Sequence, residues 1–248
     1  MRSIVLSTGG RQRWFYFTAA LFAAAVIFAG FAPTFYLRTF FGGPDGRAHY
    51  VPDMDLSTLK VAHGAIFSTW VALFVAQTWL VASDRRDIHR RLGVAGALLV
   101  VVMSIVGYLL AVDTARRGVT PDSHVTPLSF MAIPLFDLGV FVALVACALL
   151  LRRRSDWHKR LMLLATLNLL DPAIARIALQ FPPLPPLPIA FGGTAFVVLT
   201  AVIIDSVAQR RLHPAMLWGG LFVIVSLPAR ILIAGTQAWQ DFAGWLIS

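Results

Sequence analysis

The sequence predicts an all-α integral membrane protein with seven transmembrane helices, its N-terminus in the cytoplasm and its C-terminus outside. Of the 248 residues, 58% are hydrophobic and 13% are charged, whereas a soluble domain is about 25% charged. The apolar residues gather in runs that match the ~20 residues needed to cross a bilayer. The net charge is +9, but the basic residues form short clusters between these runs. That pattern is typical of membrane topology and excludes nucleic acid as a partner.

Seven apolar runs are long enough to cross a lipid bilayer, and they form one polytopic domain over residues 1–248. The first run is long for a signal peptide and the next lies far downstream, so we expect a retained helix. The predicted spans are residues 14–32, 59–81, 92–112, 127–151, 161–181, 188–207 and 214–236.

The connections between the spans are short, except for the outer loop at residues 33–58. This loop is too short for a separate domain and is a candidate lid over the bundle. The connection FPPLPPLP at 181–188 contains five prolines. They preclude a helix there and favour a rigid, extended connector.

The basic residues predict the orientation. Fourteen of the 21 Lys and Arg residues lie on one side of the predicted membrane and five on the other, with Arg176 and Arg230 inside spans. Loops rich in Lys and Arg stay in the cytoplasm. We therefore expect a multi-pass protein of a bacterial inner membrane whose N-terminus is cytoplasmic.

A short phrase occurs twice, in SDRRDIHRRLG at 83–93 and SDWHKRLMLLA at 155–165. Each segment contains Asp, any one residue, His, two basic residues and Leu in that order. A third segment, RRLHPAM, matches this pattern more weakly and begins the last span. In one interpretation Asp87 and Asp156 cap helix N-termini, while the basic side chains reach the lipid headgroups. That interpretation accounts for every residue type except the repeated histidine.

The positions of four histidines favour a second interpretation. His63 and His124 are expected at the outer ends of spans 2 and 4, and His89 and His158 at the inner ends of spans 3 and 5. Neutral imidazole is a good axial ligand for haem iron, and a four-helix core can hold a porphyrin between facing helices. The pattern thus predicts one haem b site near each membrane face.

Two of these segments resemble a known family. HGAIFSTW, starting at His63, and HRRLG at 89–93 resemble helix starts of the diheme cytochrome b561 family, over about residues 60–165. This resemblance implies electron transfer to a redox partner through two b-type haems held by His63, His124, His89 and His158. The whole chain resembles more closely a group of uncharacterised bacterial seven-span proteins, which implies a topology but no particular activity.

Polar residues recur every seven positions in the second span, at His63, Trp70 and Gln77. Seven residues make nearly two helical turns, so the three side chains share one face. Lipid offers them no hydrogen-bond partner, and we expect this face to look into the bundle. The face either packs helices together or lines a cavity for a ligand or cofactor.

Four charged residues are expected deep inside the spans: Asp137, Asp171, Arg176 and Arg230. A charge at mid-bilayer costs at least ~2.5 kcal/mol, so neutralising pairs are expected, and by depth Asp137 suits Arg176 or Arg230. Asn168 lies one turn before Asp171. Pro172 and Pro228 predict kinks beside these charges.

Three functions remain open from these observations. The first, and the best specific prediction, is a transmembrane electron carrier with haem b. The second is a transporter or receptor with an outward-facing pocket for a small ligand or protons, and the third is a structural or assembly protein. No Walker loop, His-Glu-x-x-His or dinucleotide fingerprint occurs, so no catalytic residue is predicted. The single cysteine, Cys147, is expected in the core.

Overall fold

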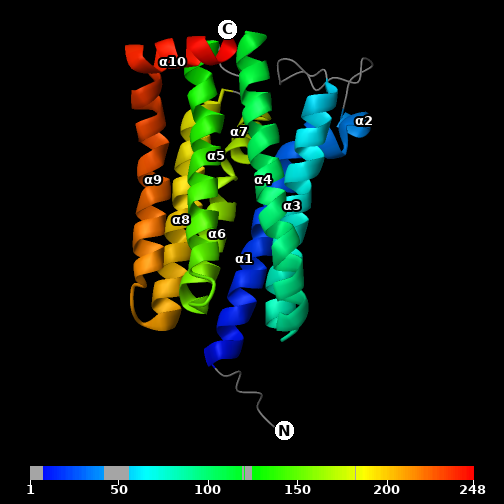
Figure 1. Ribbon diagram of the computed structural model, residues 1–248, viewed down its shortest axis with the longest axis vertical. Helices are drawn as coiled ribbons and strands as arrows, with labels where there is room; N and C mark the ends of the chain where they lie inside the picture. The colour runs from blue at the N-terminus through cyan, green and yellow to red at the C-terminus, as the bar shows by residue number, and fades with distance from the viewer. Residues whose placement is uncertain (1–7, 42–55, 119, 121–124, 182) are drawn as a thin grey trace.

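The computed structural model describes residues 8–41, 56–118, 120, 125–181 and 183–248, and side-chain positions from residue 13 onward. These parts of the chain form an elongated bundle of helices without strands (Figure 1). The elements are α1 (Thr8–Phe31), the π-helix η1 (Ala32–Tyr36), α2 (Arg38–Phe41), α3 (Thr58–Ala82), α4 (Arg86–Arg116), α5 (Pro127–Leu150), α6 (Ser155–Asn168), α7 (Asp171–Leu179), α8 (Pro186–Gln209), α9 (Pro214–Ala234) and α10 (Gln237–Ile247).

Seven helical segments are long and apolar enough to cross a bilayer, which confirms the predicted number, and the chain is a multi-pass membrane protein. The fifth segment, Ser155–Leu179, is made of two helices, α6 and α7. The turns at 83–85, 151–154 and 210–213 lie together at the end of the bundle where α1 begins, which we call the basic end (Figure 1).

At the opposite end α10 lies across the ends of α9, α5 and α4 (Figure 1). No pattern in the sequence predicted this helix. Trp239 on its inner face is buried, and its indole Nε1 donates a hydrogen bond of 2.8 Å to the carbonyl oxygen of Leu128 on α5. Trp245 is exposed, as an amphipathic residue at a membrane surface would be.

The helix starts differ from two expectations. The N-cap positions of α4 and α6 are Arg85 and Arg154. Asp87 and Asp156 therefore lie inside the first turn, where they complement the helix dipole without capping the chain. In the proline-rich connection, α8 already begins at Pro186, because proline is tolerated in the first helical turn, where its missing N–H would have no helical partner.

The lid expected at residues 33–58 is replaced in part by helical structure. Residues 32–36 form the π-helix η1 and residues 38–41 form α2. Residues 42–55 lie outside the described parts of the chain.

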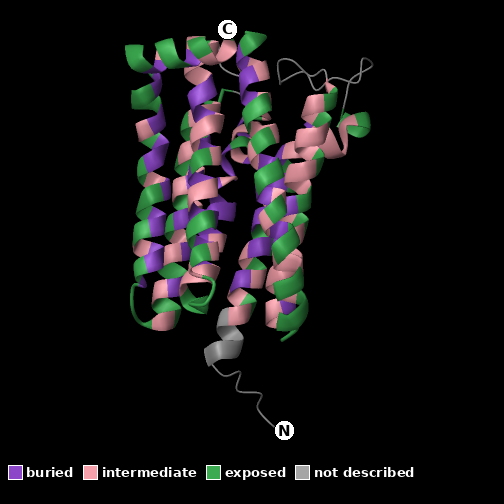
Figure 2. Ribbon diagram, in the orientation of Figure 1, coloured by how far each residue is buried: buried purple, intermediate pink, exposed green. Residues whose placement is uncertain are grey.

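The burial pattern is that of a bundle in lipid. The helices are buried on their inner faces and exposed on their outer faces (Figure 2). Apolar side chains such as Leu98 of α4 and Phe196 of α8 are exposed. The fifth span is the most buried, and Leu163 and Leu164 are completely enclosed. Cys147, expected in the core, is exposed, because it lies on a face of α5 that points away from the bundle.

The fifth span is interrupted at the place where Pro172 predicted a kink. Helix α6 ends at Asn168 and α7 begins at Asp171, because proline cannot donate the backbone hydrogen bond that would continue the helix. In contrast, α9 continues through Pro228 and α5 through Pro134. The interruption leaves a helix terminus within the fifth span.

Helix α7 packs closely against α1 at Gly30. A Cβ atom there would collide with the backbone of Ala173. We expect Gly30→Ala to destabilise the protein by about 1–3 kcal/mol, because backbone cannot move aside as a flexible side chain can. Thermal unfolding in detergent measures the effect.

The matched control is Gly192→Ala in α8, where a Cβ would meet no atom within 4 Å. Alanine favours a helix over glycine by about 1 kcal/mol, so this variant should unfold at the same or a higher temperature. Equal destabilisation by both substitutions would contradict the close packing of α1 on α7.

Candidate functional site

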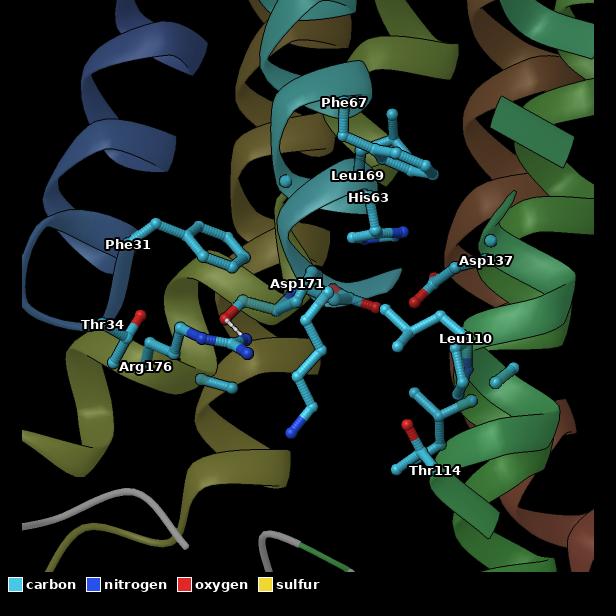
Figure 3. Close-up of a pocket in the computed structure, with 18 of the residues that line it drawn as sticks. Phe31, Thr34, His63, Phe67, Leu110, Thr114, Asp137, Leu169, Asp171 and Arg176 are labelled. Atoms are coloured by element: carbon cyan, nitrogen blue, oxygen red, sulfur yellow. Dashed lines mark hydrogen bonds between the residues drawn. The ribbon is translucent and has the colours of Figure 1, made fainter. Parts of the chain in front are cut away.

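A cavity of about 390 Å³ lies in the half of the bundle away from the basic end, lined by residues of α1, η1, α3, α4, α5, α7 and α8. Most lining side chains are apolar. The charged side chains and the one histidine in the lining are Lys60, His63, Asp137, Asp171 and Arg176. Figure 3 shows His63, Asp137 and Asp171 converging on the cavity from three different helices. Small-molecule sites have this size and this mixture of an apolar wall with a few polar groups.

His63 lies on the wall formed by α3. Its ring stacks on Phe67, one turn further along the helix, with centroids 4.0 Å apart. Its Nδ1 atom is buried and has no hydrogen-bond partner among the described residues. A buried polar atom without a partner is costly, so this atom is suited to a bound group or water.

The remainder of the predicted polar face on α3 packs into the bundle. The Trp70 ring contacts Phe141 edge-on, with centroids 5.0 Å apart. Gln77 donates from Nε2 to the carbonyl oxygen of His89 at 3.2 Å. Only His63 of the three lines the cavity.

Beside the cavity, two carboxylates share one guanidinium. Nη1 of Arg230 lies 2.5 Å from Asp137 Oδ1 and 3.0 Å from Asp171 Oδ2. Arg230 is completely buried, and its other nitrogens donate to the carbonyl oxygen and hydroxyl of Ser226. The guanidinium also lies over the Phe191 ring at 5.3 Å. Of the two partners considered for Asp137, the structure pairs it with Arg230.

The helix break positions this cluster. Asp171 is the first residue of α7, where a carboxylate interacts favourably with the helix dipole. Asn168, the last residue of α6, donates from Nδ2 to the backbone oxygen of Asp137 at 2.9 Å. Broken helices in membranes place charged termini at binding sites in this way.

Arg176 stands on the opposite wall, one helical turn into α7. Its guanidinium lies 4.3 Å from the centroid of the Phe31 ring, and Nη1 donates to the Pro172 carbonyl oxygen at 3.0 Å (Figure 3). Arg176 therefore adds positive charge to the cavity wall.

A second buried ion pair lies near the basic end, and the sequence analysis missed it. Arg160 donates to Asp205 through Nε at 2.8 Å and Nη2 at 3.1 Å, and the Tyr16 hydroxyl donates to the same carboxylate at 3.0 Å. Neither Arg160 nor Asp205 stood out in the sequence as a candidate for a buried pair. An aspartate near the end of an apolar span was the available signal, but its partner is 45 residues away.

The repeated histidines also meet near the basic end. The His89 and His158 rings have centroids 6.3 Å apart and planes at 80°. Nδ1 of His158 is 2.8 Å from the Ala148 carbonyl oxygen. In the third, weaker repeat of this pattern, RRLHPAM, His213 Nε2 contacts Asp156 Oδ2 at 3.0 Å.

His89 and His158, whose ring centroids are 6.3 Å apart, are the residues that would hold a haem iron near the basic end, and the haem would supply one-electron chemistry there. The hydrogen bond from His158 to Ala148 would orient one ring and leave Nε2 for the metal. The expected outer pair is not settled, because His124 lies outside the described residues. Among the described residues no cluster of three or more potential metal ligands occurs.

A comparison with known protein families, with curated proteins and with solved structures finds no match for this chain.

The Arg160–Asp205 pair yields a stability prediction. Asp205→Asn should destabilise the protein by about 3–5 kcal/mol, because Arg160 would keep a buried charge without a counter-charge. The matched control is Asp113→Asn, which removes an exposed partner of Arg117 and should cost less than ~1 kcal/mol. Unfolding in detergent compares the two; similar losses would argue against a buried pair.

Proposed function

We propose that this protein is a transporter or receptor that binds a small polar or anionic molecule in the cavity between α3, α5 and α7. The observation that carries the proposal is the position of this cavity directly beside the Asp137–Arg230–Asp171 cluster. A purely structural cluster would be expected to lie in closed packing. Here both carboxylate residues line an open space.

The chemistry of the cavity supports a ligand with both apolar and polar parts. The aromatic side chains of Phe31, Phe67 and Phe191 supply an apolar wall. Lys60 and Arg176 add positive charge to the lining, which favours a negatively charged group on the ligand. Intramembrane ionisable residues that face a cavity commonly mark a substrate or ion pathway.

The proposal includes a direction. The basic end carries the turns rich in arginine, and such turns stay in the cytoplasm. We further propose a bacterial inner membrane as the protein's location, and in this orientation the cavity would lie in the outer half of that membrane. A ligand would then enter from outside.

A cavity-filling variant tests the binding site. Thr114→Trp places a large ring on the cavity wall, and Val101→Trp places the same ring on the exposed face of the same helix. A thermal-shift screen of small metabolites should find compounds that stabilise the parent protein and Val101→Trp but not Thr114→Trp. Binding that survives Thr114→Trp, or a screen without any stabilising compound, would favour a structural role.

A second candidate function rests on a different observation, the approach of His89 to His158. Haem b bound there would supply a one-electron carrier at the basic end. The two histidines would hold the iron, with the His158 ring oriented by the Ala148 carbonyl oxygen.

An absorption spectrum tests this second function. Protein purified from haem-supplied cells should show a reducible Soret band, and His158→Ala should lose it. His213→Ala removes a histidine that pairs with Asp156 instead, and it should keep the band. A colourless parent protein would exclude the electron carrier.

A further inference from the structure

The cluster around Arg230 has unequal numbers of acidic and basic groups. One guanidinium nitrogen, Nη1, contacts both Asp137 and Asp171. If all three groups are ionised, the cluster carries one net negative charge in a buried region of the bundle. An uncompensated buried charge is very costly, and such groups neutralise instead.

The second buried pair shows how this protein neutralises a charge completely. Arg160 faces one carboxylate, Asp205, through two hydrogen bonds, and Tyr16 donates a third. Each oxygen of that carboxylate thus has a donor. Asp205 and Arg160 are balanced one to one, and their charges cancel.

The Asp171 carboxylate is satisfied on one side only. Its Oδ2 atom accepts from Arg230, whereas Oδ1 is buried without a hydrogen-bond partner among the described residues. The buried Thr194 hydroxyl, which has no other partner in the described parts of the chain, faces this carboxylate as a potential donor. Asp171 itself is 2% exposed, so bulk water does not compensate for the missing donor.

The other ionisable groups near the cluster come from several helices. His63 and Lys60 on α3 and Arg176 on α7 line the same cavity. The guanidinium of Arg176 lies over Phe31 and donates to Pro172. These groups set the charge of the cavity wall, while Arg230 is the cation in contact with both carboxylates.

We infer that Asp137 and Asp171 together bind one proton, which they exchange with the cavity. The bound state holds Arg230 as a cation, one carboxylate and one carboxylic acid, and is neutral overall. Its proton comes from water in the cavity and returns there through Asp137, whose side chain is 11% exposed. The start of α7 favours the ionised form of Asp171, so Asp137 is the better position for the proton.

This inference extends the proposed function, on which its biological role rests. A carboxylate pair that takes up a proton beside a ligand cavity gives a transporter its coupling ion. Release of the proton would leave a negative charge in the cavity wall, and an anionic ligand would then be disfavoured. Proton and anion should therefore bind together.

Infrared spectroscopy of the full chain in a detergent without ester carbonyls, such as dodecyl maltoside, tests the inference without a ligand. The parent should show the carbonyl band of a protonated carboxylic acid, and this band should shift in D₂O. Asp137→Asn and Asp171→Asn should each lose it, because the remaining carboxylate would pair with Arg230 as an ion. Asp113→Asn, at an exposed pair, should keep it.

Thermal unfolding of the same variants gives a second readout. Each single Asn variant should melt close to the parent, because a neutral side chain replaces a carboxylic acid. The double variant should melt at a clearly lower temperature, as Asp205→Asn should. Absence of the carbonyl band from the parent, or its survival in both single variants, would overturn the inference, as would single variants as unstable as Asp205→Asn.

The two proposals can fail separately. If the carbonyl band is present but no compound stabilises the protein, the proton site is supported and the ligand site is refuted. If a compound binds in the cavity but the carbonyl band is absent, the ligand site is supported and the proton site is refuted.

Discussion

The need to neutralise charge away from water governs the interior of this protein. Arg230 and Arg160 are both buried, at opposite halves of the bundle. Each is held by aspartates from other helices, so the ion pairs join segments that are distant in sequence. Apolar contacts in lipid discriminate poorly between alternative helix arrangements. We interpret these pairs as the interactions that select one arrangement.

The two clusters differ in what surrounds them. The Arg160–Asp205 pair is buried and its two charges cancel, as expected for an ion pair that only holds helices together. The Arg230 cluster contains a second carboxylate, a break between α6 and α7 and an adjoining cavity. Because of these differences, we propose a packing role for the first cluster and ligand chemistry for the second.

Composition and hydropathy sufficed to predict the seven spans, because membrane insertion depends mainly on local sequence. The break in the fifth span was signalled by Pro172, and the burial of Asp137 and Arg230 by their place in apolar runs. The Arg160–Asp205 pair was missed, because which helices touch depends on tertiary packing. Helix α10 was missed too, since 11 residues beyond the last span are too few to give a hydropathy signal of their own.

The central claim is that the cavity opens to water on the side of the membrane opposite the basic turns. The most direct measurement is thiol labelling of Thr114→Cys in a Cys147→Ser background, in intact spheroplasts. The account predicts rapid modification by a membrane-impermeant reagent added outside. Modification only after the membrane is opened, or none at all, would contradict either the orientation or the cavity.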